Sequence, residues 1–152
     1  MSKVVIGVDP DSKANGVAVY IDKKLSIVDR LDLMEIIDLF VELQSHVMPF
    51  ELHIEDVCAN NAPFVNRKKF HSQKAYEAAV KATCRKVGMC QQAQIEVERA
   101  ALYHGIDVFK HKISSAWKDK AGKKQFELAT GWAGRSNEDS RSAAYFGFLG
   151  CG

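Results

Sequence analysis

The chain has 152 residues, a formal net charge of +2, and hydrophobic and charged fractions of 47% and 26%. These values are typical of a soluble globular protein, and the length suits one domain spanning residues 1–152. No apolar run approaches the ~18 residues that cross a membrane. The first residues lead into an apolar run rather than a signal peptide, so we exclude membrane proteins and expect no membrane partner.

The cysteine pattern gives no sign of a metal or disulfide framework. There is no C-x-x-C pair and no histidine at zinc-finger spacing around the four cysteines, which are Cys58, Cys84, Cys90 and Cys151. We interpret them as reduced thiols in a cytoplasmic protein, with zinc binding as the less favoured alternative.

The first third of the chain reads as three strands. Residues 4–9 form a continuous apolar run, which is typical of a strand covered on both faces. A polar turn separates this run from a second strand over 17–21, and residues 22–24 form a tight turn before a third strand over 25–31. Asp32 is the expected N-cap of a helix whose apolar residues recur from Leu33 and which stops before Pro49.

The remaining elements alternate between helix and strand. In chain order we expect a strand over 51–57, a loop over 58–67, helices over 68–86 and from Gly88 to about 104, a strand over 106–111, and helices over 123–130 and 138–149. Gly88 is taken as the break between the two middle helices. This order predicts an α/β fold with a five-stranded mixed sheet, three of its strands forming an antiparallel meander, and helices on both faces.

Acidic residues stand where two of these strands end. Asp9 closes the first strand, and Glu55 lies near the end of the strand over 51–57. If the two strands are parallel neighbours, both carboxylates emerge at the carboxyl edge of the sheet, with Glu138 and Asp139 at the start of the last helix. Clustered carboxylates suit Mg²⁺ or Mn²⁺, and two such ions support phosphodiester cleavage. The alternative for a single strand-end acid is a simple turn residue.

The charge is unevenly distributed along the chain. Residues 1–62 carry five Lys or Arg against eleven Asp or Glu, whereas residues 67–86 hold seven basic residues and one acid. Residues 110–135 hold seven basic residues and two acids. This pattern indicates a surface for a polyanion around a cation-binding site, and the alternative is a pair of solvated helix faces.

Four stretches resemble the RuvC branch of the ribonuclease H-like nucleases, in particular a short phage-type or bacterial Holliday junction resolvase. "IGVDPDSKANGVAVY" (6–20) is similar to the opening signature of that family, and "LHIEDV" (52–57) to its second motif. "GMCQQAQIEVERAALYHGIDVFKHKISSAWK" (88–118) resembles the helix and strand before its basic segment, and "NEDSRSAAYFGFLG" (137–150) its closing helix. The resemblance covers nearly the whole chain.

The resemblance implies roles for individual residues. Asp9 matches a metal ligand that bridges two Mg²⁺ or Mn²⁺ ions, Glu55 matches the second ligand, and Asp139 matches one acid of the last helix. The family usually has another acid a few residues later, but residues 140–143 are Ser, Arg, Ser and Ala, so Glu138 is the remaining acidic candidate. Lys118 is the favoured lysine for stabilising charge on the transition-state phosphate.

Further residues are expected to contact DNA. Phe64 is expected either to wedge between bases at a branch point or to pack in the core. The basic residues expected to bind phosphates are Arg67, Lys68, Lys69, Lys110, Lys112, Lys120, Lys123 and Lys124.

The resemblance implies a metal-dependent endodeoxyribonuclease of DNA recombination and repair that resolves Holliday junctions or other branched DNA by symmetric hydrolysis. Paired cuts in a two-fold symmetric junction require two active sites, so we expect a homodimer in a bacterial or phage-infected cell. Two alternatives stay open: a ribonuclease H-like nuclease acting on RNA–DNA hybrids, and a non-catalytic protein that binds junctions.

Overall fold

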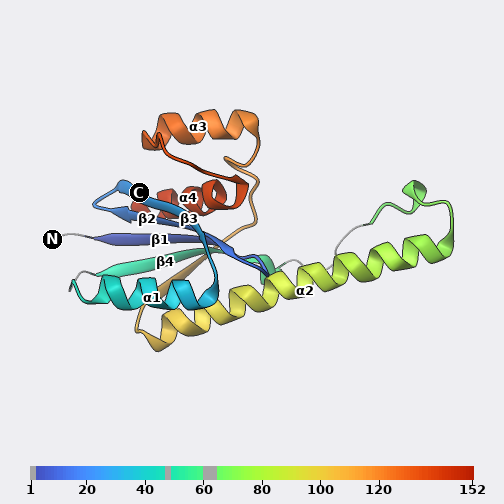
Figure 1. Ribbon diagram of the computed structural model, residues 1–152, viewed down its shortest axis with the longest axis horizontal. Helices are drawn as coiled ribbons and strands as arrows, with labels where there is room; N and C mark the ends of the chain where they lie inside the picture. The colour runs from blue at the N-terminus through green and yellow to red at the C-terminus, as the bar shows by residue number, and fades with distance from the viewer. Residues whose placement is uncertain (1–2, 47–48, 60–64) are drawn as a thin grey trace.

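The computed structural model describes residues 3–46, 49–59 and 65–152, and its centre is a five-stranded mixed sheet (Figure 1). The strand order across the sheet is β3-β2-β1-β4-β5. In chain order the elements are β1 (Val4–Asp9), β2 (Asn15–Ile21), β3 (Lys24–Leu31), α1 (Leu33–Gln44), β4 (Phe50–Glu55), the long helix α2 (Gln73–Tyr103), β5 (Asp107–His111), α3 (Lys120–Thr130) and α4 (Glu138–Cys151). Short 3₁₀ turns at Val57–Ala59 and Arg67–Lys69 lie between β4 and α2. The expected fold class and strand arrangement are confirmed.

The strand directions follow from the lengths of the connections. β1, β2 and β3 form an antiparallel meander, and the two-residue turn between β2 and β3 places Asp22 and Lys23 at φ 50° and 68°. Positive φ at both central residues matches the right-handed twist of the strands in a tight hairpin. β4 runs parallel to both β1 and β5, because a helix carries the chain back across the sheet before each of these pairings.

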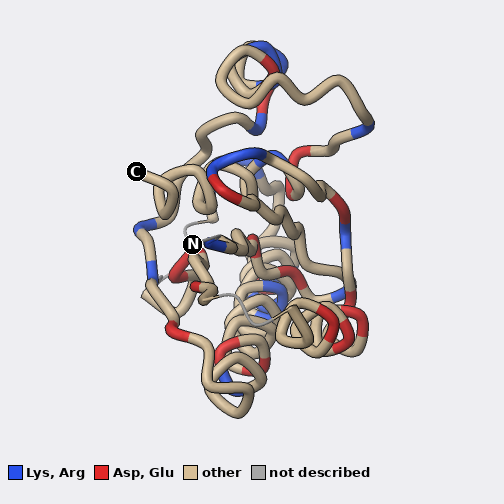
Figure 2. The backbone as a smooth tube through the Cα atoms, turned by 90° about the vertical axis from the view of Figure 1, so that its left-hand side faces the viewer, with Lys and Arg blue, Asp and Glu red and all other residues tan. Residues whose placement is uncertain are grey.

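Helices cover both faces of the sheet, and each face has its own core. Alternate residues of β1 point to opposite sides, so Ile6 and Val8 pack with α1 and the second half of α2, whereas Val5 packs with α4. Helix α3 lies outside α4, farthest from the sheet, and Figure 2 shows basic residues on it at the top of the view. Carboxylates at odd positions of β1 and β4 therefore belong to the α4 side.

Two glycines allow α4 to lie directly on the sheet. A Cβ on Gly7 of β1 would overlap the carbonyl oxygen of Ala143, and a Cβ on Gly16 of β2 would overlap that of Asp139. Any side chain at either position would therefore push the α4 backbone away. The depth of α4 on the sheet, and with it the position of Asp139, depends on these close backbone contacts.

The expectation of two middle helices separated at Gly88 is wrong. α2 is one 31-residue helix, and its N-cap is Ser72, whose side chain accepts a hydrogen bond from Ala75 N. Gly88 lies inside the helix in open space. A glycine costs a helix only about 1 kcal/mol relative to alanine, so it lowers stability there without ending the helix. Lys68, expected in the helix, belongs instead to the 3₁₀ turn at Arg67–Lys69.

The first half of α2 projects away from the sheet, as Figure 1 shows. We call residues 65–88 the arm. It comprises the 3₁₀ turn at Arg67–Lys69 and the part of α2 before Met89. Its boundary is set at Met89 because that residue lines a pocket together with the β1–β2 turn. At 1.5 Å per residue, the sixteen helical residues of the arm extend about 24 Å. At its tip, the Arg67 guanidinium lies over the Tyr76 ring and donates to the Phe70 carbonyl oxygen.

Candidate active site

Asp9 and Glu55 lie side by side at the carboxyl edge of the sheet. The parallel register of β1 and β4 pairs Val8 with Ile54, and each acid is the next residue of its strand. Both are buried, each only 4% exposed. Strand 51–57 was expected to end two residues later, but β4 ends at Glu55 and Val57 begins a 3₁₀ turn. Glu55 therefore stands at the very end of its strand, as Asp9 does.

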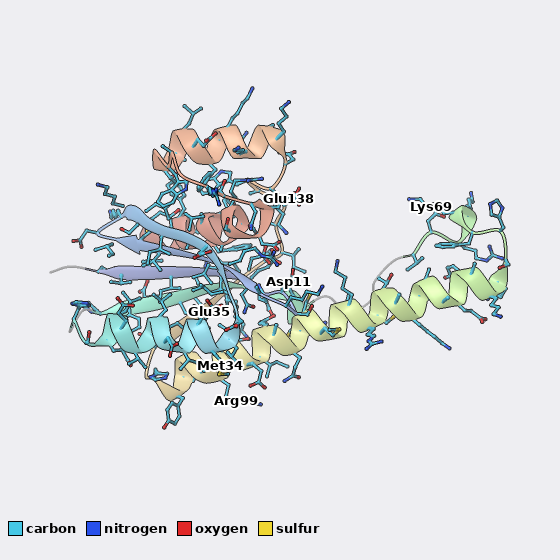
Figure 3. All side chains as sticks on the ribbon, in the orientation of Figure 1. Asp11, Met34, Glu35, Lys69, Arg99 and Glu138 are labelled. Carbon is cyan, nitrogen blue, oxygen red and sulfur yellow. The ribbon has the colours of Figure 1, made fainter. Side chains whose placement is uncertain are left out.

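The first turn of α4 adds Asp139 to this edge. Asn137 caps the helix: its side chain accepts from Ser140 N, and the Ser140 hydroxyl donates back to the Asn137 carbonyl oxygen. Asp139 is half-buried and lies 3.9 Å from Arg30 Nε. Glu138 precedes Asp139 and is exposed, because neighbouring residues on a helix point about 100° apart. Figure 3 shows Glu138 at the end of the body from which the arm projects.

Lys118 supplies a positive charge within this acidic group. Its Nζ lies 3.4 Å from Asp9 Oδ2, and both groups are largely shielded from solvent. Asp9 Oδ2 is buried, and the Lys118 ammonium is its charged partner among the described residues. Close by, the backbone N–H of Ser114 donates to Glu55 Oε2 at 3.4 Å. The segment between β5 and α3 thus contacts both strand-end acids.

The pKa values show how strongly these groups interact. Burial and then the nearby Asp9 carboxylate raise the pKa of Glu55 to about 7. Burial also raises the pKa of Asp9, against the opposing effect of Lys118. The pKa of Asp139 is raised by burial and by Asp11, whose carboxylate is a further acid near the site. For Lys118, burial favours the neutral amine, but Asp9 and Glu55 outweigh it and raise the pKa.

Ser142 is a site residue that the sequence interpretation passed over because it is not acidic. It lies three residues after Asp139, on the same side of the helix, and its hydroxyl faces the Asp9 carboxylate and favours the charged form. Its Oγ is buried beside that carboxylate. The i, i+3 spacing from Asp139 was the available signal. A buried hydroxyl and a buried carboxylate oxygen therefore lie side by side here.

The donor set fits a hard divalent cation. Carboxylate oxygens are the ligands that Mg²⁺ and Mn²⁺ prefer, and the raised pKa values of the buried Asp9 and Glu55 indicate a need for positive charge. As the side chains are placed, no three Asp, Glu, His or Cys residues in the described ranges surround a single point. Lys118 provides the positive charge in this arrangement.

The residues expected to bind DNA fall into separate regions. Phe64 lies outside the described residues. Arg67, Lys68 and Lys69 lie at the tip of the arm, where Figure 3 labels Lys69 far from Asp11 and Glu138. The other expected residues are all exposed, on β5, just after it, or on α3: Lys110, Lys112, Lys120, Lys123 and Lys124. They flank Lys118 along the chain and lie on the body rather than on the arm.

A membrane location receives no support from the helices. Among the residues that the structure describes, no helix combines the length and apolar character needed to cross a bilayer.

The strand order β3-β2-β1-β4-β5, with helices on both faces of the sheet, is that of a RuvC-like fold of the ribonuclease H-like class. A structure of RuvC from Thermus thermophilus in complex with a Holliday junction substrate has a TM-score of 0.59 and 15% identity, covering 96% of this chain and 90% of that chain. A second T. thermophilus RuvC structure has a TM-score of 0.54 and 16% identity, covering 95% and 91%.

No family model and no curated protein matches the sequence. At 15–16% identity, the likeness to the two RuvC structures establishes the fold. Any assignment of activity to this chain therefore depends on the chemistry of its own site.

Proposed function

We propose that the protein is a metal-dependent, structure-selective endodeoxyribonuclease that resolves Holliday junctions or other branched DNA. The observation that carries this proposal is the buried Asp9–Glu55 pair at the carboxyl edge of a RuvC-like sheet, beside the half-buried Asp139. Like charges are costly to bury together, and a site for a divalent cation is the simplest reason to do so. The T. thermophilus RuvC of similar fold is described with a Holliday junction substrate, which favours branched DNA here.

In the proposed mechanism, Asp9, Glu55 and Asp139 would hold Mg²⁺ or Mn²⁺, with Glu138 as a further acid nearby. Such cations supply an activated water and stabilise the leaving oxygen of a phosphodiester. Ser142 adds a neutral oxygen beside Asp9. Lys118 keeps a positive charge at the edge, where it offsets the negative charge that develops on the phosphate being cleaved. Burial of the strand-end acids excludes bulk water and strengthens these interactions.

The arm supports a DNA substrate because its charge is positive and accessible. Residues 65–88 carry seven Lys or Arg and one acid, Glu77. All seven basic side chains are exposed, and none forms an ion pair with an acid of the described residues. Exposed cationic side chains on a projecting arm suit a polyanion, since phosphate contacts release condensed counterions. The proposed assembly is a homodimer, which brings two sites to a symmetric junction.

Cleavage of a synthetic mobile four-way junction tests the proposal. Wild-type protein is expected to cut it symmetrically with Mg²⁺ or Mn²⁺ but not with Ca²⁺ or EDTA. Asp9→Asn is expected to lose cleavage by roughly 100-fold or more while still binding the junction, because the amide keeps the shape but removes the ligand charge. Asp38→Asn, an exposed carboxylate of α1, is the matched control and leaves cleavage unchanged. Cleavage by Asp9→Asn at the wild-type rate contradicts the mechanism.

Two observations favour a second candidate, a junction-binding protein without catalysis. The last helix has no acid after Asp139 and presents the Ser142 hydroxyl to Asp9 instead, and Lys118 pairs with Asp9 directly. This reading predicts wild-type binding to four-way junctions without cleavage in Mg²⁺ or Mn²⁺. A linear duplex and an RNA–DNA hybrid in the same assay separate both candidates from a ribonuclease H-like activity on hybrids.

A further inference from the structure

The segment that carries Lys118 has an unusual backbone conformation. Trp117, immediately before Lys118, has φ 66°, in the left-handed region that large L-residues rarely adopt. Its ring is buried and contacts Phe126, Tyr145 and Phe148. A residue stays in this conformation only when its surroundings fix it there. The contacts around Trp117 therefore matter for where Lys118 points.

Arg141 of α4 provides the polar part of these contacts. Its guanidinium donates from Nε to the Trp117 carbonyl oxygen at 2.8 Å and from Nη2 to the Lys118 carbonyl oxygen at 2.7 Å. A third bond runs from Nη1 to Ser136 Oγ at 3.2 Å. Two successive peptide groups are thus held by one planar side chain, which fixes both their position and their orientation.

The chemistry of Arg141 points to a role other than stability. The residue is only 6% exposed, and within the described residues its guanidinium has no carboxylate partner within ion-pair distance. A buried charge without a counter-charge is a poor way to stabilise a fold. Arg141 lies between Asp139 and Ser142 in α4. This one helix therefore supplies two site residues and also holds the backbone of Lys118.

The opposite side of this segment is fixed by α3. Its N-cap Asp119 accepts a hydrogen bond from Gly122 N, and a Cβ on Gly122 would lie 2.6 Å from Trp117 Cα. The chain from Trp117 to Asp119 is therefore held between the start of α3 and the side chain of Arg141. This arrangement directs the Lys118 side chain to Asp9, where Nζ lies 3.4 Å from Oδ2.

We propose that Arg141 is a positioning residue that fixes the Trp117–Lys118 backbone so that the Lys118 ammonium stays against the strand-end acids. Its kinetic consequence depends on the nuclease activity proposed above, but the positioning itself does not. Two experiments separate these parts, one independent of any activity and one kinetic.

Amide hydrogen exchange tests the positioning. Arg141→Met is expected to raise exchange in residues 114–119 by roughly tenfold or more, because two charge-assisted hydrogen bonds to the segment are lost. Lys118→Met is expected to leave exchange there unchanged, since Arg141 bonds to backbone carbonyls. Arg135→Met removes an exposed guanidinium of the preceding loop and serves as the matched control. Unchanged exchange in Arg141→Met overturns the proposal.

If Arg141→Met does not fold, Arg141→Lys takes its place. A lysine keeps the charge but cannot hold two carbonyl groups in one plane, so exchange is expected to rise in the same segment. Thermal unfolding of each variant distinguishes local opening from general loss of structure. Exchange that rises equally across the whole chain indicates a purely structural role and contradicts the proposal.

A double-mutant cycle tests whether Arg141 acts through Lys118. Arg141→Met and Lys118→Met are each expected to lower the junction-cleavage kcat by roughly 10- to 100-fold with little change in junction Kd, and the double variant to be no slower than Lys118→Met. Multiplicative effects contradict action through Lys118. If wild-type protein cleaves no junction, hybrid or duplex, the nuclease proposal fails while the exchange result still decides the positioning.

Discussion

At the scale of single residues, the site concentrates carboxylates whose pKa values are raised above their ordinary values. Glu55 has its pKa raised from the ordinary value of 4.5 to about 7 by burial and by Asp9. The folded protein therefore binds more protons than the unfolded chain between about pH 4.5 and 7. Stability contributed by this residue falls as the pH rises through that interval, and the divalent cation that we propose would offset the loss by binding the ionised form.

Glu55→Gln tests this electrostatic cost. In EDTA at pH 8 the variant is expected to unfold at a higher temperature than wild type, because it removes a buried negative charge beside Asp9. At pH 5, where wild-type Glu55 is mostly protonated, the difference is expected to be small. Thermal unfolding from pH 5 to 8 gives the measurement, and Glu42→Gln on the exposed side of α1 is the control. A wild-type Tm that rises from pH 5 to 8 relative to Glu55→Gln contradicts the expectation.

Ser142 offers a second test at this scale. Ser142→Asp places another carboxylate beside Asp9, which is expected to lower Tm in EDTA through repulsion and to tighten Mn²⁺ binding by roughly tenfold. Calorimetric Mn²⁺ titration and thermal unfolding measure the two effects. Ser26→Asp on the exposed β3 should change neither. Weaker Mn²⁺ binding by Ser142→Asp would show that the hydroxyl does not face a cation site.

At the scale of elements, α4 organises the site. It supplies Asp139, Ser142 and Arg141, and its first turn is fixed by the Asn137–Ser140 capping box. Its approach to the sheet requires Gly7 and Gly16, where backbone meets backbone without an intervening side chain. A small displacement of α4 would therefore move one acid, one hydroxyl and the support of Lys118 together.

A matched pair of glycine substitutions tests this dependence. Gly16→Ala is expected to destabilise the protein by about 1–3 kcal/mol and to lower cleavage, because the new methyl group overlaps the Asp139 carbonyl oxygen and α4 must shift. Gly88→Ala, in open space within α2, is expected to stabilise by about 0.5–1 kcal/mol. Denaturant unfolding measures both. Equal effects at the two positions would show that the close contact under α4 does not matter.

At the scale of the whole molecule, the basic arm and the acidic edge occupy different places. The arm projects from the end of the body where Asp11 and Glu138 lie, and its tip carries Arg67, Lys68 and Lys69 (Figure 3). The β2–β3 turn, with Lys23 and Lys24, lies at the opposite end of the strands. A DNA that reaches the acidic edge would thus have the arm beside it and the hairpin far from it.

Salt dependence of junction binding tests the arm. The double variant Lys68→Gln, Lys69→Gln is expected to reduce the slope of log K against log salt by about 2, since each lost phosphate contact removes roughly 0.9. Cleavage at saturating protein should change little, because the acidic edge is untouched. Lys23→Gln with Lys24→Gln removes the same charge at the other end of the strands and serves as the control. Equal slopes for the two double variants would exclude a special role for the arm.

Much of the fold was determined by local pattern in the sequence. Continuous or alternating apolar residues marked all five strands, the Asp32 capping box marked the start of α1, and acids at the strand ends marked the edge where Asp9 and Glu55 meet. These features work because side-chain burial repeats with the period of a strand or a helix, and parallel strands end at a common edge. The expected break at Gly88 failed because a modest local penalty does not end a long helix.

Only the tertiary structure decided which side chains complete the site. The contact of Lys118 with Asp9 joins residues 109 positions apart, and Arg141 reaches back to Trp117 across 24. Such contacts depend on how deeply α4 lies on the sheet and on a left-handed Trp117, neither of which has a local signature. Sequence periodicity predicts which face of an element is buried. The packing of elements that are distant in sequence determines which partner each buried polar group contacts.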